Sequence, residues 1–83
     1  FDIVFNDIEK ERYPEALEVI SPRLRTGGVL ITDNMFWHGR VLEREPDAQT
    51  QGILKYTASL FQSPEWVSTI VPLRDGVAIS LKM

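Results

Sequence analysis

Two short apolar runs, each followed by an acidic residue, stand out in the pattern of this chain. Residues 1–6 are bulky and mostly apolar, and Asp7 follows them. Residues 29–33 contain the most apolar run, which ends at Asp33-Asn34. Short runs of this kind predict buried β-strands. The second run is apolar on both faces, which is typical of a strand covered by helices on both sides.

A helix-sized segment separates the two strands. Residues 11–24 have apolar side chains at helical spacing, which predicts an amphipathic helix. Pro14 is tolerated in the first turn, whereas Pro22 kinks or ends the helix. The Gly27-Gly28 pair is expected to stop the helix with a left-handed cap. The apolar stripe consists of Tyr13, Ala16, Leu17, Ile20 and Leu24.

The remainder of the chain predicts one more helix and two more strands. Asp47 can cap a helix over residues 48–62. Residues 66–72 and 77–82 alternate as strands do, and the Arg-Asp-Gly turn at 74–76 joins them as an antiparallel hairpin. The inner face of the helix is expected to consist of Ile53, Leu54, Thr57 and Phe61.

The predicted order of elements is β-α-β-α-β-β, with a loop over residues 34–46. Right-handed crossovers place the first two strands side by side and parallel. With 83 residues, the chain is expected to form one α/β domain. We expect a partial domain, residues 1–83, because Phe1 falls directly inside a strand-like run.

Composition narrows the classes of function. The net charge is −3 and no Lys/Arg cluster occurs, which argues against a nucleic-acid partner. No apolar stretch approaches the roughly 18 residues that a membrane helix needs, so no membrane partner is expected. The chain contains no Cys, which excludes disulfides and thiolate chemistry. A cytoplasmic location is the default expectation.

The acids that follow the two strands form the candidate site together with Asn34. Adjacent parallel strands lie about 4.8 Å apart, and open α/β sheets bind ligands at the edge where their strands end. Asp7, Asp33 and Asn34 would meet at that edge. Two carboxylates and an amide oxygen suit Mg²⁺, Mn²⁺ or Ca²⁺. A cation of this kind lowers the pKa of a bound hydroxyl.

Three neighbouring residues extend the hypothesis, and each also has a plainer structural interpretation. Lys10 could act as a general base with a pKa lowered by the cation, or it could be a solvated surface lysine. Trp37 and His38 could border a flat substrate, or Trp37 could cover a loop and His38 could be a surface or otherwise satisfied histidine. Asp7 could be a helix cap, and the Asp-Asn pair after the second strand is also ordinary turn chemistry.

Three blocks of the sequence resemble motifs of the cation-dependent O-methyltransferases of the catechol and caffeoyl-CoA type. Residues 1–10 (FDIVFNDIEK), followed by Tyr13, resemble Phe-Asp-x-x-Phe-x-Asp-Ala-Asp-Lys-x-x-Tyr. Residues 24–41 (LRTGGVLITDNMFWHGRV) resemble Leu-Arg-x-Gly-Gly…Asp-Asn-x-x-Trp-x-Gly-x-Val. Residues 71–77 (VPLRDGV) resemble the closing Pro-x-x-Asp-Gly hairpin. The likeness covers nearly the whole chain.

The resemblance implies a reaction and a ligand set. Asp7, Asp33 and Asn34 match the family's metal ligands. Lys10 matches the lysine proposed as its general base. The implied reaction transfers a methyl group from S-adenosylmethionine to a hydroxyl of a small acceptor, aromatic acceptors included. The implied fold is a Rossmann-like, mostly parallel seven-stranded sheet with one reversed strand, here residues 77–82.

The resemblance also implies contacts to the cofactor and to the acceptor. Asp7, Ile8 and Glu9 match positions beside the cofactor. Trp37 and His38 fall in the loop that borders the acceptor pocket. Two of these positions depart from the family, which often has Ala in place of Ile8 and usually has Asp in place of Glu9.

The likeness covers only the rear half of the family domain. The glycine-rich loop that cradles the cofactor, and the acid that holds its ribose, lie upstream in the family. We therefore expect these 83 residues alone to be inactive. The first strand would be central in the whole fold, so in this chain it has an unpaired apolar edge. We expect either a homodimer formed through that strand or marginal stability.

Two other functions stay open. The chain could be a non-catalytic docking module or a self-associating α/β module, and the unpaired strand edge favours that hypothesis. A receiver-like phospho-acceptor domain also gathers acids and a lysine at strand ends. That kind of domain has its acid pair near its first strand and no closing hairpin, so the turn at residues 74–76 argues against it.

Overall fold

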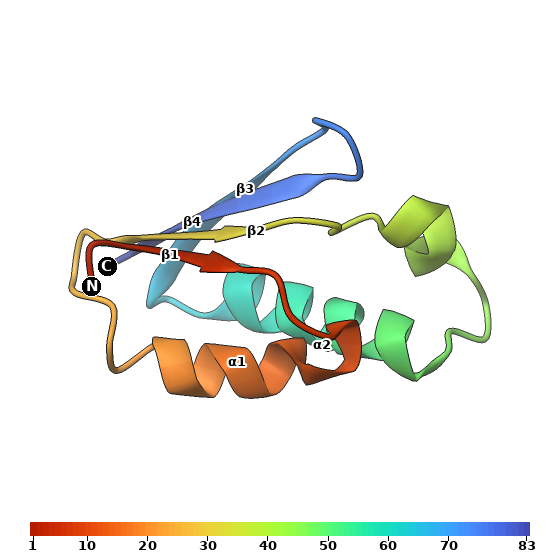
Figure 1. Cartoon of the computed structure of the whole chain (residues 1–83), viewed down its shortest axis with the longest axis horizontal. Helices are drawn as coiled ribbons and strands as arrows, with labels where there is room; N and C mark the ends of the chain where they lie inside the picture. Colours follow the sequence, from red (N-terminus) through yellow and green to blue (C-terminus); the bar gives the residue numbers. More distant parts are fainter.

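The computed structural model describes residues 1–83 as a four-stranded sheet with both α-helices on one face (Figure 1). The strands are β1 (Ile3–Asn6), β2 (Val29–Thr32), β3 (Trp66–Val71) and β4 (Val77–Lys82). The α-helices are α1 (Tyr13–Ile20) and α2 (Ala48–Gln62), and the short 3-10 helices are η1 (Lys10–Arg12) and η2 (Trp37–Leu42). The predicted β-α-β-α-β-β order is confirmed.

The sheet combines one parallel and two antiparallel pairs in the order β1-β2-β4-β3. The predicted parallel pairing of β1 with β2 is confirmed, in a register that pairs Asn6 with Thr32. Asp7 and Asp33 are the next residues along these strands, so both leave the sheet at the same edge. β4 runs antiparallel to both its neighbours, which confirms the hairpin and the expected reversed strand.

The first helix is shorter than the predicted range of 11–24. It begins with the 3-10 turn η1, and α1 ends at Ile20, two residues before Pro22. The proline therefore limits the helix, as expected from its missing N–H. The glycine pair does not cap the helix, which corrects the prediction. Gly27 has a left-handed φ of +85°, but it lies in the turn that enters β2, where its N–H donates to the backbone of β4.

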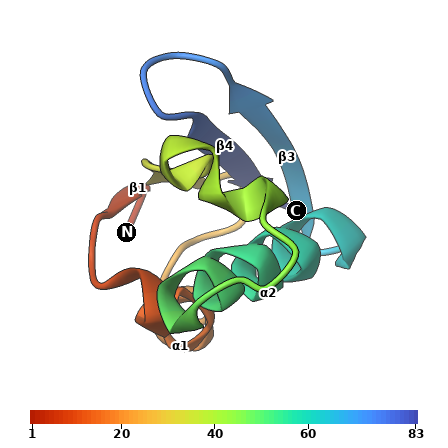
Figure 2. The same ribbon diagram turned by 90° about the vertical axis from the view of Figure 1, so that its right-hand side faces the viewer.

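The second helix spans the predicted residues 48–62, and Asp47 caps it. The Asp47 carboxylate accepts a hydrogen bond from the Thr50 N–H at 2.8 Å, as an N-cap side chain does. The expected loop over 34–46 is not wholly irregular, because it contains η2. Figure 1 shows η2, in yellow-green, at the end of the molecule beyond β2, and Figure 2 shows it above α2.

The predicted inner face of α2 is wrong in part. Ile53 is buried as expected, but Leu54 and Phe61 are 38% and 49% exposed. Tyr56 and Leu60 are fully buried instead. Helical spacing from Ile53 allows either row, and the packing of α2 against α1 and η1 decides between them.

The sheet has one covered face and one bare face, which corrects two predictions. α1 and α2 both lie on the same side, so β2 is not covered on both faces (Figure 1). β1 was predicted to be buried, but Ile3 and Phe5 are 65% and 59% exposed on the side without helices. Alternate residues point to opposite faces of a strand, so only Val4 and Asn6 of β1 face the helices.

The core lies between the sheet and the two helices. The buried apolar side chains are Tyr13, Leu24, Leu30, Met35, Ile53, Tyr56, Leu60, Trp66 and Ala78.

Neither α-helix has the length and apolarity that a membrane span requires.

Candidate functional site at the strand ends

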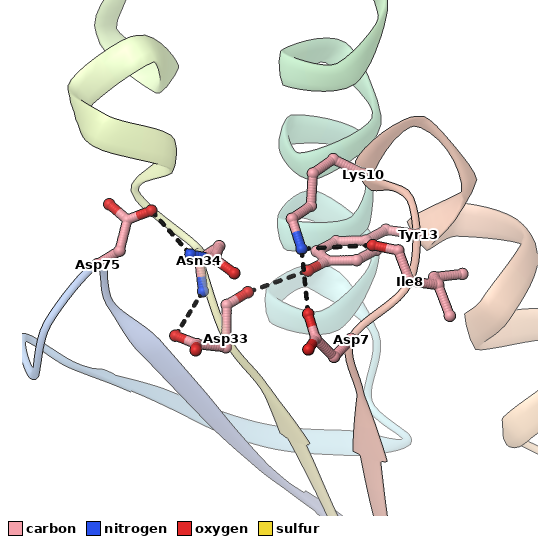
Figure 3. A network of polar contacts seen from close by, with 7 residues as sticks. All are labelled: Asp7, Ile8, Lys10, Tyr13, Asp33, Asn34 and Asp75. Carbon is pink, nitrogen blue, oxygen red and sulfur yellow. Dashed lines mark hydrogen bonds and ion pairs between the residues drawn. The ribbon is translucent and has the colours of Figure 1, made fainter.

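The parallel pairing of β1 and β2 brings the two predicted acids to neighbouring positions. Figure 3 shows Asp7 and Asp33 at the ends of the two strands, with Asn34 next to Asp33. The Asp7 side chain is 61% exposed. Neither η1 nor α1 has a side-chain cap, so Asp7 is not the helix cap that the plainer interpretation proposed.

One oxygen of the Asp33 carboxylate is already engaged by the backbone of the next residue. Asp33 Oδ1 accepts a hydrogen bond from the Asn34 N–H at 2.7 Å. Asn34 adopts a left-handed φ of 60°, a conformation that Asn tolerates better than most residues. This bond leaves the second Asp33 oxygen and the side-chain carbonyl oxygen of Asn34 available to a ligand.

Lys10 is not a solvated surface lysine, because it is only 8% exposed. Its Nζ lies 3.4 Å from Asp7 Oδ1 and donates to the Ile8 carbonyl at 3.3 Å. Nζ also lies 5.0 Å from the centroid of the Tyr13 ring. Burial lowers the pKa of Lys10, but the Tyr13 hydroxyl and the Asp7 carboxylate outweigh it, so the pKa is raised above its usual value. The direction set by these protein groups is therefore upward, whereas the sequence predicted a lowering by a bound cation.

Tyr13 belongs to the site as well as to the core. Its ring is fully buried, and its hydroxyl donates to the Asp33 carbonyl at 3.0 Å. Burial raises the pKa of Tyr13 more than neighbouring Lys10 lowers it. The sequence placed Tyr13 only on the apolar stripe of the helix and in the family motif. The polar tip of an otherwise apolar side chain was the signal available.

Asp75 is a site residue that the sequence placed only in a turn. Its Oδ2 accepts a hydrogen bond from Asn34 Nδ2 at 3.1 Å, and its Oδ1 accepts one from the His38 N–H at 2.8 Å. Burial raises the pKa of the Asp75 carboxyl, but these two hydrogen bonds outweigh it and hold the pKa below its usual range. Figure 3 shows Asp75 on one side of Asn34 and Asp7 on the other.

Trp37 and His38 lie beside each other in the loop after β2, with ring centroids 5.5 Å apart. The Trp37 ring packs against the core and lies 5.7 Å from Lys10 Nζ. The His38 side chain is 72% exposed. Both residues have positive φ, 49° and 56°, a strained conformation of the kind that collects at functional sites.

An open hollow lies beside the end of β1. It is lined by Asp7, Ile8, Glu9 and Arg12, which include the three predicted cofactor contacts. Ile8 is 43% exposed although it is a large apolar residue. Arg12, which the sequence analysis did not single out, also lines the hollow.

The oxygen donors at the ends of β1 and β2 are few. Nowhere in residues 1–83 do three or more His, Cys, Asp or Glu side chains gather closely enough to hold a metal. A cation at the strand ends would therefore depend on two carboxylates and one amide oxygen. Mg²⁺ commonly binds proteins through one or two carboxylates and keeps several waters, so the set fits a cation of that class.

Comparison with known proteins identifies related sequences. A family model described as O-methyltransferase matches residues 1–83. Tricin synthase 2 of Oryza sativa subsp. japonica is 29% identical over 90 residues, which cover all of this chain and 31% of that protein. Catechol O-methyltransferase domain-containing protein 1 of Mus musculus is 29% identical over 84 residues, which cover all of this chain and 32% of that protein.

A solved structure extends the comparison to three dimensions. The O-methyltransferase TomG of Streptomyces achromogenes, described as involved in tomaymycin synthesis and solved in complex with SAM, superposes with a TM-score of 0.91. It is 27% identical, and the match covers all of this chain and 40% of that protein. The chain thus spans between about a third and two fifths of the length of the proteins it matches.

Proposed function

Because this chain belongs to the O-methyltransferase family, we propose that it provides the cation-binding and proton-accepting part of an S-adenosylmethionine-dependent O-methyltransferase. The acceptor is a hydroxyl of a small molecule, with aromatic acceptors among the candidates. The observation that carries the proposal is the in-register end of β1 and β2, which delivers Asp7 and Asp33 to one edge beside buried Lys10.

Asp7, Asp33 and Asn34 would hold the cation, with Mg²⁺ first and Mn²⁺ or Ca²⁺ as alternatives. When bound, such a cation lowers the pKa of a hydroxyl and fixes its direction. The chain supplies the free oxygen of Asp33, the carbonyl oxygen of Asn34 and the exposed carboxylate of Asp7. These groups are all oxygen donors, which supports a hard cation over a thiophilic one.

Lys10 would accept the proton from the acceptor hydroxyl. It is the one buried cationic side chain at the strand ends, and Asp7 and the Ile8 carbonyl hold its Nζ in place. Its raised pKa means that it is an ammonium in this arrangement and must lose a proton before it acts as a base. A neighbouring positive charge lowers the pKa of a lysine and would favour that loss.

The cofactor would lie in the hollow beside β1, against Asp7, Ile8 and Glu9. The hollow adjoins the proposed cation ligands through Asp7, which supports this assignment. Trp37 and His38 would border the acceptor, because their loop follows Asn34 directly. Backside attack on the methyl group then depends mainly on positioning of the two reactants. A cytoplasmic location and the lack of nucleic-acid and membrane partners stay predictions.

Two measurements test this proposal. The natural protein should methylate a catechol or caffeate-type acceptor in the presence of Mg²⁺, and EDTA or Asp33→Asn should abolish the transfer. The 83 residues alone should show no micromolar binding of S-adenosylmethionine by calorimetry, because they lack the glycine-rich cofactor loop. Methyl transfer that is indifferent to both EDTA and Asp33→Asn would contradict the proposal.

A second candidate function is self-association through β1 and the bare face of the sheet, with a second copy of this chain as the occupant. The register aligns apolar residues of all four strands on that face. Six of its bulky side chains are between 38% and 65% exposed, namely Ile3, Phe5, Val67, Val71, Ile79 and Leu81. A contiguous exposed apolar face of this kind marks an interaction surface.

The size of this face supports a dimer. The face extends over all four strands, and homodimer interfaces are more apolar than the rest of a protein surface. The free edge of β1 can also pair with the same strand of a second copy, because an edge strand has unpaired backbone N–H and C=O groups.

A further inference from the structure

The turn between β3 and β4 holds the loop that follows β2. The Met35 N–H donates to the Gly76 carbonyl at 3.0 Å, and the Phe36 N–H donates to the Asp75 carbonyl at 2.9 Å. The Asp75 side chain adds the bonds from His38 and Asn34 described above. Four hydrogen bonds therefore tie the turn to residues 34–38, and one of them comes from the Asn34 amide of the proposed cation site.

The Asp75 carboxylate also determines which end of the Asn34 amide faces the site. An ionised carboxylate accepts hydrogen bonds and has no proton to donate, so only the NH₂ end of an amide can face it. Asn34 Nδ2 lies 3.1 Å from Asp75 Oδ2, and the amide carbonyl oxygen on the same planar group points elsewhere. Since Asp75 and Asp7 lie on opposite sides of Asn34, this orientation leaves the oxygen free for the side of the cation ligands (Figure 3).

Asp75 is less available to a ligand than Asp7 is. Each of its two oxygens already accepts a hydrogen bond, one from Asn34 and one from His38. Its side chain is only 16% exposed. The carboxylate is therefore engaged by the loop, in contrast to the Asp7 carboxylate, which is 61% exposed.

We propose that Asp75 is a positioning residue for the cation site, which holds the Asn34 amide with its carbonyl oxygen available to the cation. The inference rests on the proposed function, because it assigns a role at the same site. Mutation of a residue that hydrogen-bonds to a metal ligand typically lowers the metal affinity by about 10- to 100-fold. Asp75 acts through Asn34, so its effect must disappear when the Asn34 side chain is absent.

The first test compares the wild-type chain with Asp75→Asn, using Mn²⁺ as the probe and electron paramagnetic resonance to count the free ion. The replacement amide has a single acceptor oxygen. When the His38 N–H donates to that oxygen, the NH₂ group of the new side chain faces Asn34. The Asn34 amide then turns its own carbonyl oxygen toward position 75 and away from the cation. We expect the Kd for Mn²⁺ to rise by about 10- to 100-fold. The control is Asp2→Asn, which removes one negative charge from an exposed pair with Arg25 and should leave the Kd within about twofold.

A double-mutant cycle separates positioning from charge. Asn34→Gly removes the amide and tolerates the left-handed φ of 60°. In that background, Asp75→Asn should change the Kd by less than about twofold, because the group it orients is gone. A full 10- to 100-fold loss in the Asn34→Gly background would mean that Asp75 acts by charge or as a ligand, and would overturn the proposal.

A second readout needs no cation. In ¹H–¹⁵N spectra of the wild-type chain, one side-chain amide proton of Asn34 should be shifted and protected by its bond to Asp75, and Asp75→Asn should abolish both effects. Ordinary, rapidly exchanging amide protons in the wild type would overturn the proposal even if no Mn²⁺ binds.

The outcomes also separate this proposal from the proposed function. If Asp33→Asn abolishes Mn²⁺ binding and Asp75→Asn does not alter it, the cation site stands and the role of Asp75 is refuted. If neither Asp7→Asn nor Asp33→Asn weakens Mn²⁺ binding, the cation site itself is refuted. The amide spectrum then still decides whether Asp75 orients Asn34.

Discussion

At the scale of single residues, Lys10 has the strongest case for a direct part in proton transfer. Its ammonium is buried against Asp7 and the Tyr13 ring, in a position where charge is costly without partners. Lys10→Met preserves the apolar stem but removes the proton acceptor. In the natural protein, we expect kcat to fall by about 10²- to 10⁴-fold. The Kd for Mn²⁺ should not rise, since a positive charge has been removed from beside the ion.

The matched control for this prediction is Lys55→Met, because Lys55 is an exposed lysine of α2. It should leave both constants unchanged. A Lys10→Met enzyme with the wild-type kcat would show that the lysine serves only packing and charge balance.

The ionisation of Asp75 leads to a prediction about how the stability of the fold depends on pH. Its pKa is lowered in the folded state, so its contribution to stability is fully present above the unfolded value of about 3.9. That contribution is lost as the pH falls through the lower folded value. Urea unfolding between pH 3 and pH 7 should therefore show a decline in stability below about pH 4 that is smaller in Asp75→Asn. Identical pH profiles for the two proteins would contradict the hydrogen bonds assigned to this carboxylate.

At the scale of elements, the close contact of α2 with η1 depends on Gly52. A Cβ at this position would lie 2.3 Å from the Lys10 carbonyl oxygen and 2.6 Å from Glu11 Cα. Both neighbours are backbone atoms, so they cannot rotate away. Gly52→Ala would normally stabilise a helix by about 1 kcal/mol. Here we expect a loss of about 1–3 kcal/mol from overpacking, measured as a lower midpoint of urea unfolding.

The control is Ser59→Ala on the exposed side of the same helix, where only helix propensity changes. It should be neutral or slightly stabilising. The Gly52→Ala variant should also disturb the site, because η1 begins at Lys10. A stabilised Gly52→Ala protein would mean that α2 and η1 are further apart than the structure describes.

The elements also show which parts of the fold were predictable from sequence. Asp47 and the Asp-Gly turn at 74–76 are local signals, and they placed α2 and the β3-β4 hairpin correctly. The inner row of α2 was missed because the choice between Leu54 and Tyr56 depends on how the helix packs against its neighbours. Local periodicity does not contain that information.

The candidate site was likewise predictable from the sequence only in part. Asp7, Asp33 and Asn34 were predictable as neighbours, because each follows a strand and parallel pairing brings strand ends together. The contact of Asp75 with Asn34 was not, because 41 residues separate them and the β4 position between β2 and β3 creates it. A turn acid has many local uses, so its pattern alone gave no reason to choose this one.

At the scale of the whole molecule, the distribution of apolar surface is one-sided. Both helices cover one face of the sheet, and the opposite face and the outer edge of β1 remain open (Figure 1). Burial of β1 could not be predicted from its composition, because burial depends on what lies beyond the strand. An edge of this kind favours association with another chain.

This asymmetry leads to a prediction for the isolated 83 residues. Size-exclusion chromatography with light scattering should give a dimer, and the double change Ile3→Lys and Phe5→Lys should shift it to the monomer. Two charges on the bare face both remove apolar surface and repel the second copy. The control is Phe61→Lys, since Phe61 is an exposed apolar residue of α2, on the face of the sheet that the helices cover. A wild-type chain that stays a stable monomer at high concentration would contradict the self-association proposal.

The proposed function requires Asp7, Asp33 and Asn34 to share one divalent cation, and crystals grown with Mn²⁺ would show whether they do. An anomalous difference map should show one peak at the ends of β1 and β2, within about 2.0–2.6 Å of an oxygen of each of the three side chains. A map with no peak there, or with its only peak on acids elsewhere on the surface, would contradict the account.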